Sequence, residues 1–581
     1  MKILLLCHSF NSLSQRCYGE LVAAGHEVSV EFDVADSVTT EAVALWQPDL
    51  VVAPFLKRRI PEAVWRRVRC LVVHPGIVGD RGPSALDWAV MDGEREWGVT
   101  VLEANGDFDA GDVWASETFA MRDAAKGSLY RHEVTGAAVR ALLAAIARIE
   151  SGGRPTPLAE LAPQARGRAR PLVQQTDRAI AWNADDTATV LRRIRAADGM
   201  PGVADVVLGL DVRLFDAHPE GDPALRPAGA TAGTVLAHRD GAILRATRDG
   251  AVWITHLAAV GEDGVGLKLP ATMVLGERLA GVAEAPLAPA ATVAHATWRP
   301  LEYVEEGAVG FLHFPFYNGA MGTAQCEALR AAYAQAKARP TRVIALMGGP
   351  DFWSNGIHLN LIEAAEHPAE ESWRNINAMN DLVREIIDTP RQLTVAALQG
   401  NAGAGGCFLA LAADRVFARD GAIMNPHYKG MGNLYGSEYW TYLLPRRVGD
   451  AGAHAITRRR LPMLAREAAA CGLVDAAFGT DRVAFAREVA ARAHALAGHP
   501  AFVRMLTEKA QVRAADEARR PLAAYREAEL ARMRENFFGF DPSYHVARYH
   551  FVHKVPRSRT PLHLARHRVG TQPSAVAGAA A

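Results

Sequence analysis

The sequence predicts a multidomain α/β protein with a doubly wound parallel sheet, a small β-barrel and a second α/β domain with a helical tail. In the first part of the chain, apolar runs such as Lys2–Cys7 and Asp49–Phe55 alternate with helical stretches, which is the order of a doubly wound sheet. Short strands and turns alternate from Val203 to Leu257, as in a small barrel. From about Val309, buried strands and helices alternate again and predict the second α/β domain.

The composition indicates a globular protein of several domains. The 581 residues suffice for roughly three or four domains of about 150 residues each. Lys+Arg and Asp+Glu both number 64, so no surplus of charge indicates nucleic acid or a membrane as a partner. The first apolar run is too short for a signal peptide, and no run approaches the roughly 18 apolar residues of a membrane span. We therefore expect a cytoplasmic location.

The cysteines are scattered and include no C-x-x-C pair. We therefore expect buried free thiols in a reducing compartment rather than disulfides, and we predict no metal site. These residues are Cys7, Cys17, Cys70, Cys326, Cys407 and Cys471.

Polar loops follow two of the first strands and are candidates for ligand contacts. Ser12 or Ser14 is a candidate cap for the first helix, and Arg16 beside the free N–H groups there suits an anionic group of a cofactor. A solvated loop is the alternative. The loop after Phe55 presents Lys57 and two arginines, which suits either a ligand or a solvated surface.

A histidine stands where another short strand ends. The apolar run Leu71–Val73 stops at His74, and the ends of parallel strands are where such sheets bind ligands. Ser84 is a candidate cap for the next helix, Gly98–Thr100 starts another strand, and Asp109–Asp112 forms a tight acidic turn. A lone histidine at a strand end is usually structural, but the ordered combination of these elements favours a site.

The combination of H-P, R-G-P-S, G-V-T and D-A-G-D resembles the formyltransferases that use 10-formyltetrahydrofolate. The resemblance implies that His74 is the catalytic histidine and Asp109 the catalytic aspartate. It also implies cofactor contacts from Arg81 and from the loop that contains Lys57. The asparagine that donates to the developing oxyanion in this family is Val72 here, which argues against ordinary formyl transfer to an amine.

The end of this part and the next domain also have signatures. Residues 120–150 predict an amphipathic helix, and residues 151–170 are rich in Gly, Pro and Arg, as in a linker. The motif D-R-A-I-A-W at 177–182 resembles the start of the C-terminal domain of methionyl-tRNA formyltransferase, which contains a small β-barrel. We therefore predict a formyltransferase-like domain over 1–165 and a barrel domain over 172–275.

Two glycine-containing loops follow buried strands in the last part of the chain. They are G-G-P-D-F-W-S-N-G-I-H-L at 348–359 and Q-G-N-A-G-A-G-G-C-F at 399–408. So many glycines in short loops imply that the backbone approaches a ligand closely. A phosphate-binding loop is the alternative, but no G-K-[ST] follows.

These loops resemble those of the crotonase (enoyl-CoA hydratase/isomerase) family. The resemblance predicts a spiral α/β domain over 300–560, including a helical tail. It implies that the backbone N–H groups of Ile357 and Gly405 form an oxyanion hole for an acyl-CoA thioester, with Gly403 and Gly406 against coenzyme A. Each such donor contributes a factor of order 10²–10³ to a rate.

The positions of the acid and base in the crotonase family are altered. One family glutamate is Phe408 here and the other aligns with His427, so the usual addition of water is not expected. The remaining polar candidates are His427, Tyr428 and Glu438. They are structural instead if Asn433–Tyr442 begins a helix.

The two halves together resemble the hydrogenase maturation proteins of the HypX/HoxX family, over nearly the whole chain. This resemblance implies a bifunctional enzyme that makes carbon monoxide for nickel–iron hydrogenase from 10-formyltetrahydrofolate and coenzyme A. In this hypothesis His74, oriented by Asp109, takes the proton of the CoA thiol, and a formyltransferase step yields formyl-CoA. Tyr428 and Glu438 then serve a decarbonylase (lyase) step that releases CO and CoA.

Two alternatives stay open. The chain can be a formyltransferase to a protein or amine with a non-catalytic CoA-binding module, or a non-enzymatic maturation scaffold. The expected partners are the one-carbon donor, CoA and other hydrogenase maturation proteins, without nucleic acid or a membrane.

Overall fold

The computed structural model describes residues 1–569. The chain forms two compact units. The first comprises residues 1–178, residues 195–199 and the C-terminal segment from Pro556, and the second comprises residues 179–194 and 200–555. Segments from both ends of the sequence therefore fold into the same unit.

The first unit is built on a six-stranded sheet with the order β2-β1-β3-β4-β5-β6. Its first four strands are parallel, as predicted, whereas β5 pairs antiparallel with both β4 and β6. The last pair differs from a doubly wound sheet because the connection between β5 and β6 is too short for a parallel crossover. The strands are β1 (Lys2–Cys7), β2 (Glu27–Phe32), β3 (Leu50–Phe55), β4 (Cys70–His74), β5 (Glu96–Glu103) and β6 (Val113–Ala120).

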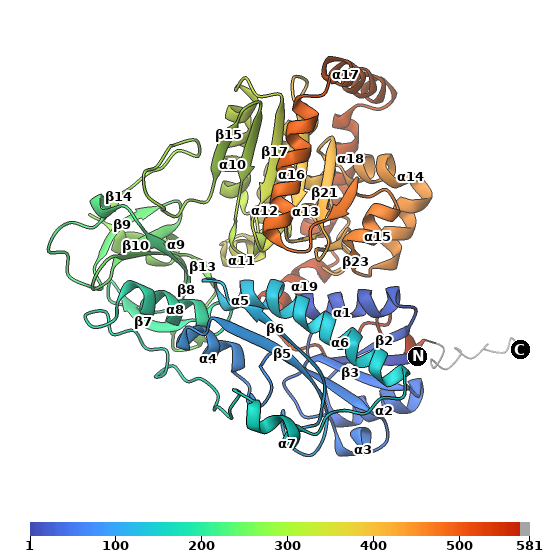
Figure 1. The fold of residues 1–581 in the computed structure, drawn as a ribbon. Helices are drawn as coiled ribbons and strands as arrows, with labels where there is room; N and C mark the ends of the chain where they lie inside the picture. Colours follow the sequence, from blue (N-terminus) through green and yellow to red (C-terminus); the bar gives the residue numbers. More distant parts are fainter. Residues whose placement is uncertain (570–581) are drawn as a thin grey trace, which may run out of the picture. The chain divides into compact units, whose positions relative to one another are not determined.

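Helices cover both faces of this sheet. Figure 1 shows α1 and α6 along one face and α2 and α3 along the other. On the second face, Trp46 and Val64 of the helices pack with Leu4 and Val51 of the strands. The helices are α1 (Ser12–Ala23), α2 (Asp36–Trp46), α3 (Glu62–Trp65), α4 (Ala85–Asp92), α5 (Lys126–Leu129), the π-helix η1 (Tyr130–Val134) and α6 (Thr135–Glu150). The helix expected over 120–150 thus begins later, because β6 occupies the chain to Ala120.

Two helix caps differ from the prediction. The cap of α1 is Asn11, whose side chain accepts a hydrogen bond from the N–H of Ser14 (2.9 Å), and is neither Ser12 nor Ser14. Ser84 does precede α4, but its hydroxyl accepts the N–H of Val173 (3.2 Å) and makes no cap bond. The first cap is a local one that lies one residue before the first of the predicted serines, and only at Ser84 does a tertiary contact occupy the hydroxyl.

Residues 556–569, called the C-terminal strap from here on, pack on β2, the edge strand of the first sheet. The N–H of Val30 donates to the carbonyl of Leu564 (3.0 Å). The fully buried Glu31 carboxylate accepts a hydrogen bond from His567 (2.8 Å). The strap therefore covers part of an edge that would otherwise expose unpaired backbone groups.

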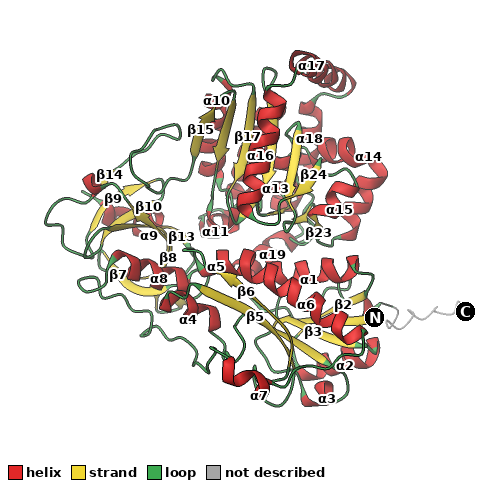
Figure 2. Cartoon of the chain, in the orientation of Figure 1, coloured by secondary structure: helices red, strands yellow, loops and turns green. Residues whose placement is uncertain are grey.

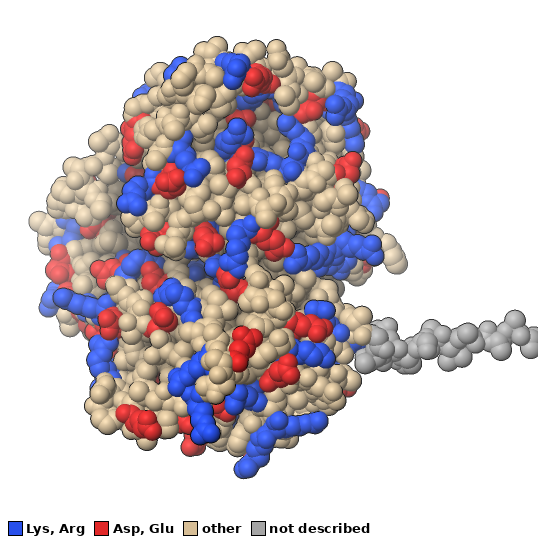
Figure 3. All heavy atoms as spheres, turned by 45° about the vertical axis from the view of Figure 1, so that its right-hand side comes forward, with Lys and Arg blue, Asp and Glu red and all other residues tan. Residues whose placement is uncertain are grey.

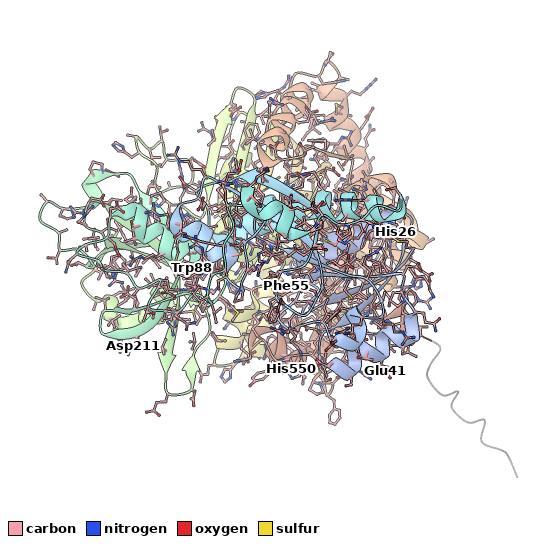
Figure 4. The ribbon with its side chains drawn as sticks, turned by 60° about the horizontal axis from the view of Figure 1, so that its bottom comes forward. His26, Glu41, Phe55, Trp88, Asp211 and His550 are labelled. Carbon is pink, nitrogen blue, oxygen red and sulfur yellow. The ribbon has the colours of Figure 1, made fainter. Side chains whose placement is uncertain are left out.

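The strap also contacts α2. Arg568 forms an ion pair with Glu41 (2.7 Å), which is labelled in Figure 4. The His567 ring lies edge-on to Trp46, with the ring centroids 6.4 Å apart. The strap is thus anchored to a strand and to a helix of the first unit.

The region predicted as a small barrel forms a sheet with the order β14-β9-β10-β11-β8-β7, and β12 and β13 pair with β11. Leu244 and Trp253 belong to its core. The longer strands are β7 (Val203–Val207), β8 (Leu210–Glu220), β9 (Val235–Arg239), β10 (Ala242–Ala246) and β11 (Ala251–Gly261). The short strands are β12 (Gly264–Val265), β13 (Leu269–Pro270) and β14 (Ala283–Glu284), and the accompanying helices are α8 (Thr187–Ala197) and α9 (Ala271–Leu275).

Two further sheets form the last part of the second unit, with the orders β15-β16-β17-β19-β21-β24 and β18-β20-β22-β23. β17, β19 and β21 of the larger sheet are each followed in the chain by a strand of the smaller one, which produces the predicted spiral. The strands are β15 (Glu302–Glu306), β16 (Val309–His313), β17 (Val343–Gly348), β18 (Phe352–Ser354), β19 (Leu393–Leu398), β20 (Asn401–Gly403), β21 (Arg415–Arg419), β22 (Ile423–Asn425), β23 (Met463–Leu464) and β24 (Ala476–Phe478).

Helices enclose the larger of these sheets, as Figure 2 shows. Phe485 and Val489 of α16 pack on one face, and residues of α10 and α12 pack on the other. The helices are α10 (Thr323–Lys337), α11 (Leu359–Ala364), α12 (Pro368–Ile387), α13 (Gly405–Leu411), α14 (Trp440–Arg459), α15 (Ala465–Ala470), α16 (Arg482–Ala497), α17 (Phe502–Arg519), α18 (Leu522–Phe538) and α19 (Ser543–Val552).

The surface carries charges of both signs. On the face drawn in Figure 3, Lys and Arg side chains are interspersed with Asp and Glu. None of the helices described has the length and apolar character needed to span a lipid bilayer. Five of the cysteines are buried free thiols as expected, but Cys471 is exposed.

Candidate functional site

His74 ends β4 and is held between two carboxylates. Only 4% of the residue is exposed. Its Nε2 lies 2.9 Å from Oδ1 of Asp80, and its Nδ1 lies 3.4 Å from Oδ1 of Asp109. Asp109 also accepts the N–H of Gly82 (3.2 Å). Each ring nitrogen therefore faces an acidic group.

The turn after His74 is fixed by the strand beside it. Thr100, which is paired with His74 in the sheet, donates its hydroxyl to the carbonyl of Gly76 (2.8 Å). A Cβ atom at position 76 would lie 2.4 Å from Nε2 of His74 and 2.6 Å from Oδ1 of Asp80. Glycine is therefore required for the imidazole and the second carboxylate to approach each other.

The two carboxylates decide the charge of His74. Burial alone lowers the pKa of His74, but the hydrogen bonds and charges of Asp109 and Asp80 outweigh it and raise the pKa to about 9. The side chain is therefore an imidazolium at neutral pH, which can donate a proton or stabilise negative charge but cannot accept a proton first. The role of His74 in taking the proton of the CoA thiol stays a prediction, and the structure adds a second carboxylate, Asp80, to the Asp109 that the sequence indicated.

Asp80 was missed in the sequence. It is 3% exposed and belongs to the G-D-R-G stretch, six residues after the histidine. The available signal was an acidic residue in a loop that must turn back toward the histidine. A burial pattern along one strand cannot show that this loop folds over the ring.

The three cations predicted to contact a cofactor have different surroundings. Arg16 lies on α1 and forms an ion pair with Glu20 one turn further on (2.6 Å). Lys57 is exposed after β3, and Arg81 is exposed next to the Asp80 loop, with its charge acting on Asp109. Lys57 and Arg81 are therefore more accessible to an anionic group than Arg16.

In the second unit, the two predicted oxyanion-hole amides lie in neighbouring loops. β18 and β20 pair in parallel, so the loops that follow them run side by side. A Cβ atom on Gly356 would lie 3.4 Å from the backbone nitrogen of Gly405, the first residue of α13. Among the residues that the structure describes, the N–H groups of Ile357 and Gly405 have no hydrogen-bond partner. Two free donors on adjoining loops are what an oxyanion hole requires.

The glycines of the second loop lie against other parts of the protein. A Cβ atom on Gly406 would lie 2.0 Å from the carbonyl oxygen of Ser354, and one on Gly403 would lie 3.1 Å from Oδ1 of Asn355. Internal packing therefore requires glycine at position 406 even without a ligand. A role for Gly403 and Gly406 in holding CoA stays a prediction.

Tyr428 and Glu438 form a buried pair against the second of these amides. The Tyr428 hydroxyl lies 2.5 Å from Oε2 of Glu438. The Glu438 carboxylate lies over Gly405, where a Cβ atom would be 2.1 Å from Oε1 of Glu438. Phe408, which replaces the family glutamate, stacks on the Tyr428 ring with the centroids 5.3 Å apart. The acidic group of this site thus comes from a later loop than in the family pattern.

The protonation states of this pair follow from burial. Burial raises the pKa of Glu438 to about 7, although its hydrogen bond with Tyr428 acts in the opposite direction. Burial, and then the charge of Glu438, raises the pKa of Tyr428 well above its usual value. At neutral pH the carboxyl therefore exists in both forms, while the phenol stays protonated.

The stretch Asn433–Tyr442 contains the beginning of a helix, as the structural alternative supposed. α14 begins at Trp440, and Glu438 lies in the loop two residues before it, so the catalytic role of Glu438 stays a prediction. His427, the third polar candidate, directly precedes Tyr428, is partly exposed, and donates its backbone N–H to the carbonyl of Asn425 (2.8 Å).

Comparisons with known families divide the chain in the same order as these sites. Residues 24–146 match the family "Formyl transferase", and residues 172–266 match "Formyl transferase, C-terminal domain". Residues 312–553 match "Enoyl-CoA hydratase/isomerase". The predicted domain limits 1–165, 172–275 and 300–560 stay a prediction, and the matched ranges lie inside them.

Individual relatives show how these parts occur together. Over 581 residues, all of both proteins, the chain is 56% identical to the hydrogenase maturation factor HoxX of Bradyrhizobium diazoefficiens. It is 30% identical over 215 residues to methionyl-tRNA formyltransferase of Desulfotalea psychrophila, covering 36% of this chain and 61% of that protein. The crystal structure of HypX from Aquifex aeolicus in complex with tetrahydrofolic acid superimposes with a TM-score of 0.94 at 49% identity, covering 99% of this chain and 100% of that one. The chain therefore belongs to the HoxX/HypX family of hydrogenase maturation factors.

Proposed function

We propose that this chain synthesises carbon monoxide for the active site of nickel–iron hydrogenase, in two steps that use 10-formyltetrahydrofolate and coenzyme A. The observation that supports the proposal most strongly is the Tyr428–Glu438 pair beside the free amides of Ile357 and Gly405. A formyl thioester has no α-carbon, so an acid–base pair at this position has only the formyl C–H to act on. The tetrahydrofolate bound by HypX of Aquifex aeolicus supports the folate half of the proposal.

The first step forms formyl-CoA in the first unit. The CoA sulfur attacks the formyl carbon, and the bond between that carbon and the folate nitrogen then breaks. His74, charged by Asp80 and Asp109, donates its proton to the departing nitrogen, and the resulting imidazole takes up the thiol proton. The imidazolium also stabilises the developing oxyanion, a task that the family's asparagine, here Val72, does not perform.

The second step breaks formyl-CoA in the second unit. The amides of Ile357 and Gly405 hold the formyl oxygen, and the Glu438 carboxylate removes the formyl hydrogen as a proton. The carbon–sulfur bond breaks, CO leaves, and the thiolate takes that proton from the Glu438 carboxyl, which regenerates both the CoA thiol and the carboxylate. Tyr428 donates its hydroxyl to Glu438 and holds the carboxylate in place. Because this step needs the ionised carboxylate, CO formation should rise with pH through about 7.

The proposed location and partners follow from this chemistry. Lys57 and Arg81, with Arg16 if its ion pair opens, are the candidates for anionic groups of the folate and of CoA. CO is a ligand for a metal centre, so other hydrogenase maturation proteins are the expected recipients. The buried free thiols fit a reducing compartment, and we place the protein in the cytoplasm.

Variants at the second site test the proposal. Tyr428→Phe and Glu438→Gln are nearly isosteric, so they should leave formyl-CoA formation from 10-formyltetrahydrofolate and CoA intact. CO, trapped by reduced myoglobin, should fall by about a hundredfold or more for Glu438→Gln, because the base is lost. Tyr549→Phe, on an exposed tyrosine, and Glu527→Gln, on an exposed glutamate, are matched controls that should behave as wild type. Undiminished CO from both site variants would remove the pair from the mechanism and leave His427 as the candidate.

A further inference from the structure

A second buried glutamate lies directly behind Glu438. Glu529, on α18, is fully buried. Its carboxylate accepts the backbone N–H groups of Tyr439 and Thr441 (both 2.9 Å), the hydroxyl of Thr441 (2.5 Å) and the hydroxyl of Ser437 (3.2 Å). All of its partners therefore flank Glu438 or begin α14.

These contacts supply a cap that α14 lacks in its own sequence. The residue at the N-cap position is Tyr439, whose side chain makes no cap bond. The first N–H groups of a helix need acceptors, and a negative charge is favourable there. Glu529 provides both from a distant segment of the chain.

The backbone at this point is strained and needs support. Glu438 and Tyr439 have φ angles of 60° and 58°, in the left-handed region that side chains other than glycine rarely adopt. Such residues cost of order 1–3 kcal/mol each and persist when their surroundings fix them. Asn380 of α12 accepts the N–H of Glu438 (2.7 Å), and Glu529 accepts that of Tyr439. The turn that directs the Glu438 carboxylate over Gly405 therefore depends on these two side chains.

An ordinary cap does not explain a buried carboxylate. Ser, Thr or Asn can cap a helix without the cost of burying a charge. Burial raises the pKa of Glu529 to about 7, against the effect of its hydrogen bonds, which shows how costly this charge is. A neutral cap would be simpler if holding the helix end were the only requirement.

We propose that Glu529 is a positioning residue for the decarbonylation step, holding the Glu438–Tyr439 turn over Gly405 and acting on Glu438 through its charge. This inference rests on the proposed function of the Tyr428–Glu438 pair. The titratable groups that act on Glu438 are Tyr428, from the loop after β22, and Glu529, and the backbone N–H of Ser437 also donates to its carboxylate (3.1 Å). The charge of Glu438 in turn acts on the thiol of Cys326 on α10. After burial, which is the larger effect, the charge of Glu529 raises the pKa of Glu438 further.

Glu529→Gln in the full-length protein tests this role. The amide keeps the size of the side chain but removes the charge and one of the acceptors. CO formation from formyl-CoA should fall about tenfold or more because the base is misplaced. Its rising pH limb should also move to lower pH, by about one unit, because a neighbouring negative charge is lost. Formyl transfer to CoA should be unchanged. Glu527→Gln, an exposed residue on the same helix, should change neither rate nor pH limb.

A second variant keeps the test decisive if the first is unstable. Glu529→Asp retains the charge, but its shorter side chain moves the carboxylate away from the N–H groups at the start of α14. The rate of CO formation should therefore fall, while the pH limb stays near that of the wild type. An unchanged rate and an unchanged pH limb in folded Glu529→Gln would overturn the inference. A loss of rate in both variants, with the rising pH limb of CO formation unchanged in each, would also overturn the inference, because a purely structural role gives that result.

A titration without turnover separates this inference from the proposed function. Infrared difference spectra, with Glu438→Gln used to assign the band, should show the Glu438 carboxyl titrating at lower pH in Glu529→Gln than in the wild type. If wild-type protein releases no CO, the proposed function fails, and this titration still decides whether Glu529 acts on Glu438. An identical midpoint in both proteins would refute that influence.

Discussion

At the scale of the residue, the first site is defined by one imidazole between two carboxylates. Nε2 of His74 lies 2.9 Å from Asp80, and Nδ1 lies 3.4 Å from Asp109. The two carboxylates stabilise the imidazolium although the ring is buried. Asp80 and Asp109 also make the contribution of His74 to folding stability depend on pH. Because the pKa of His74 is raised to about 9, its contribution to folding is complete below its ordinary value of about 6.5 and is lost as the pH rises through 9.

Removing one of the two carboxylates should separate their roles. In Asp80→Asn the pKa of His74 should fall, so the alkaline limb of formyl transfer should move from about 9 to lower pH by about one unit or more. The measurement is formyl-CoA formation across pH 6 to 10, in about half-unit steps, with CO formation from added formyl-CoA as the internal reference. Asp107→Asn removes an exposed charge from the same region and should leave the limb in place. An alkaline limb that is the same in Asp80→Asn and wild type would show that His74 does not act as the imidazolium.

At the scale of the element, the sequence predicts the limits of buried strands better than it predicts the caps of helices. The apolar runs at Lys2–Cys7 and Leu393–Leu398 are strands with those same limits, because a fully buried strand has an apolar residue at nearly every position. The cap at Asn11 and the cap that Glu529 gives to α14 were not predicted. Asn11 is a local cap that the sequence could have indicated, whereas the acceptor at the start of α14 comes from a residue about ninety positions away, on which periodicity along the chain contains no information.

The site residues likewise divide into those that the sequence could indicate and those that it could not. His74, Asp109, Ile357 and Gly405 lie in stretches whose residue patterns have a local signature, so they could be proposed from the sequence. Glu529 acts through contacts with residues about ninety positions away and has no such signature, whereas Asp80 is close to His74 in the chain but needs a loop to fold back over the ring. The left-handed turn at Glu438 and Tyr439 is also hidden, since neither residue is glycine.

The C-terminal strap is an element whose role can be tested directly. His567 is buried and bonded to Ser29 (2.6 Å) and Glu31 (2.8 Å), so His567→Ala should leave a buried carboxylate with fewer partners. We expect the first unit to lose about 2–4 kcal/mol of unfolding free energy, measured by urea unfolding. Arg566→Ala, at an exposed strap position, should lose about 0.5 kcal/mol or less. Equal stability of the two variants would mean that the strap does not stabilise this unit.

At the scale of the whole molecule, one chain combines a part of the formyl transferase family, in the first compact unit, with a part of the enoyl-CoA hydratase/isomerase family, in the second. In the proposed function, the formyl group must leave the first site as a species that the second site can recognise. A CoA thioester satisfies this requirement, since the sulfur accepts the formyl group and the crotonase-type amides bind a thioester oxygen. The family membership and the geometry of both sites are consistent with a relay in which CoA is regenerated at the end of each cycle.

The most direct test follows the carbon atom. Full-length protein, CoA and 10-formyltetrahydrofolate labelled with ¹³C in the formyl group should release ¹³CO, detected by the infrared stretch of its complex with reduced myoglobin. CO should depend on CoA, and CoA should be recovered unchanged. If the label appears only in formyl-CoA, formate or a formylated amine, with no ¹³CO in the presence of both substrates, the account is contradicted.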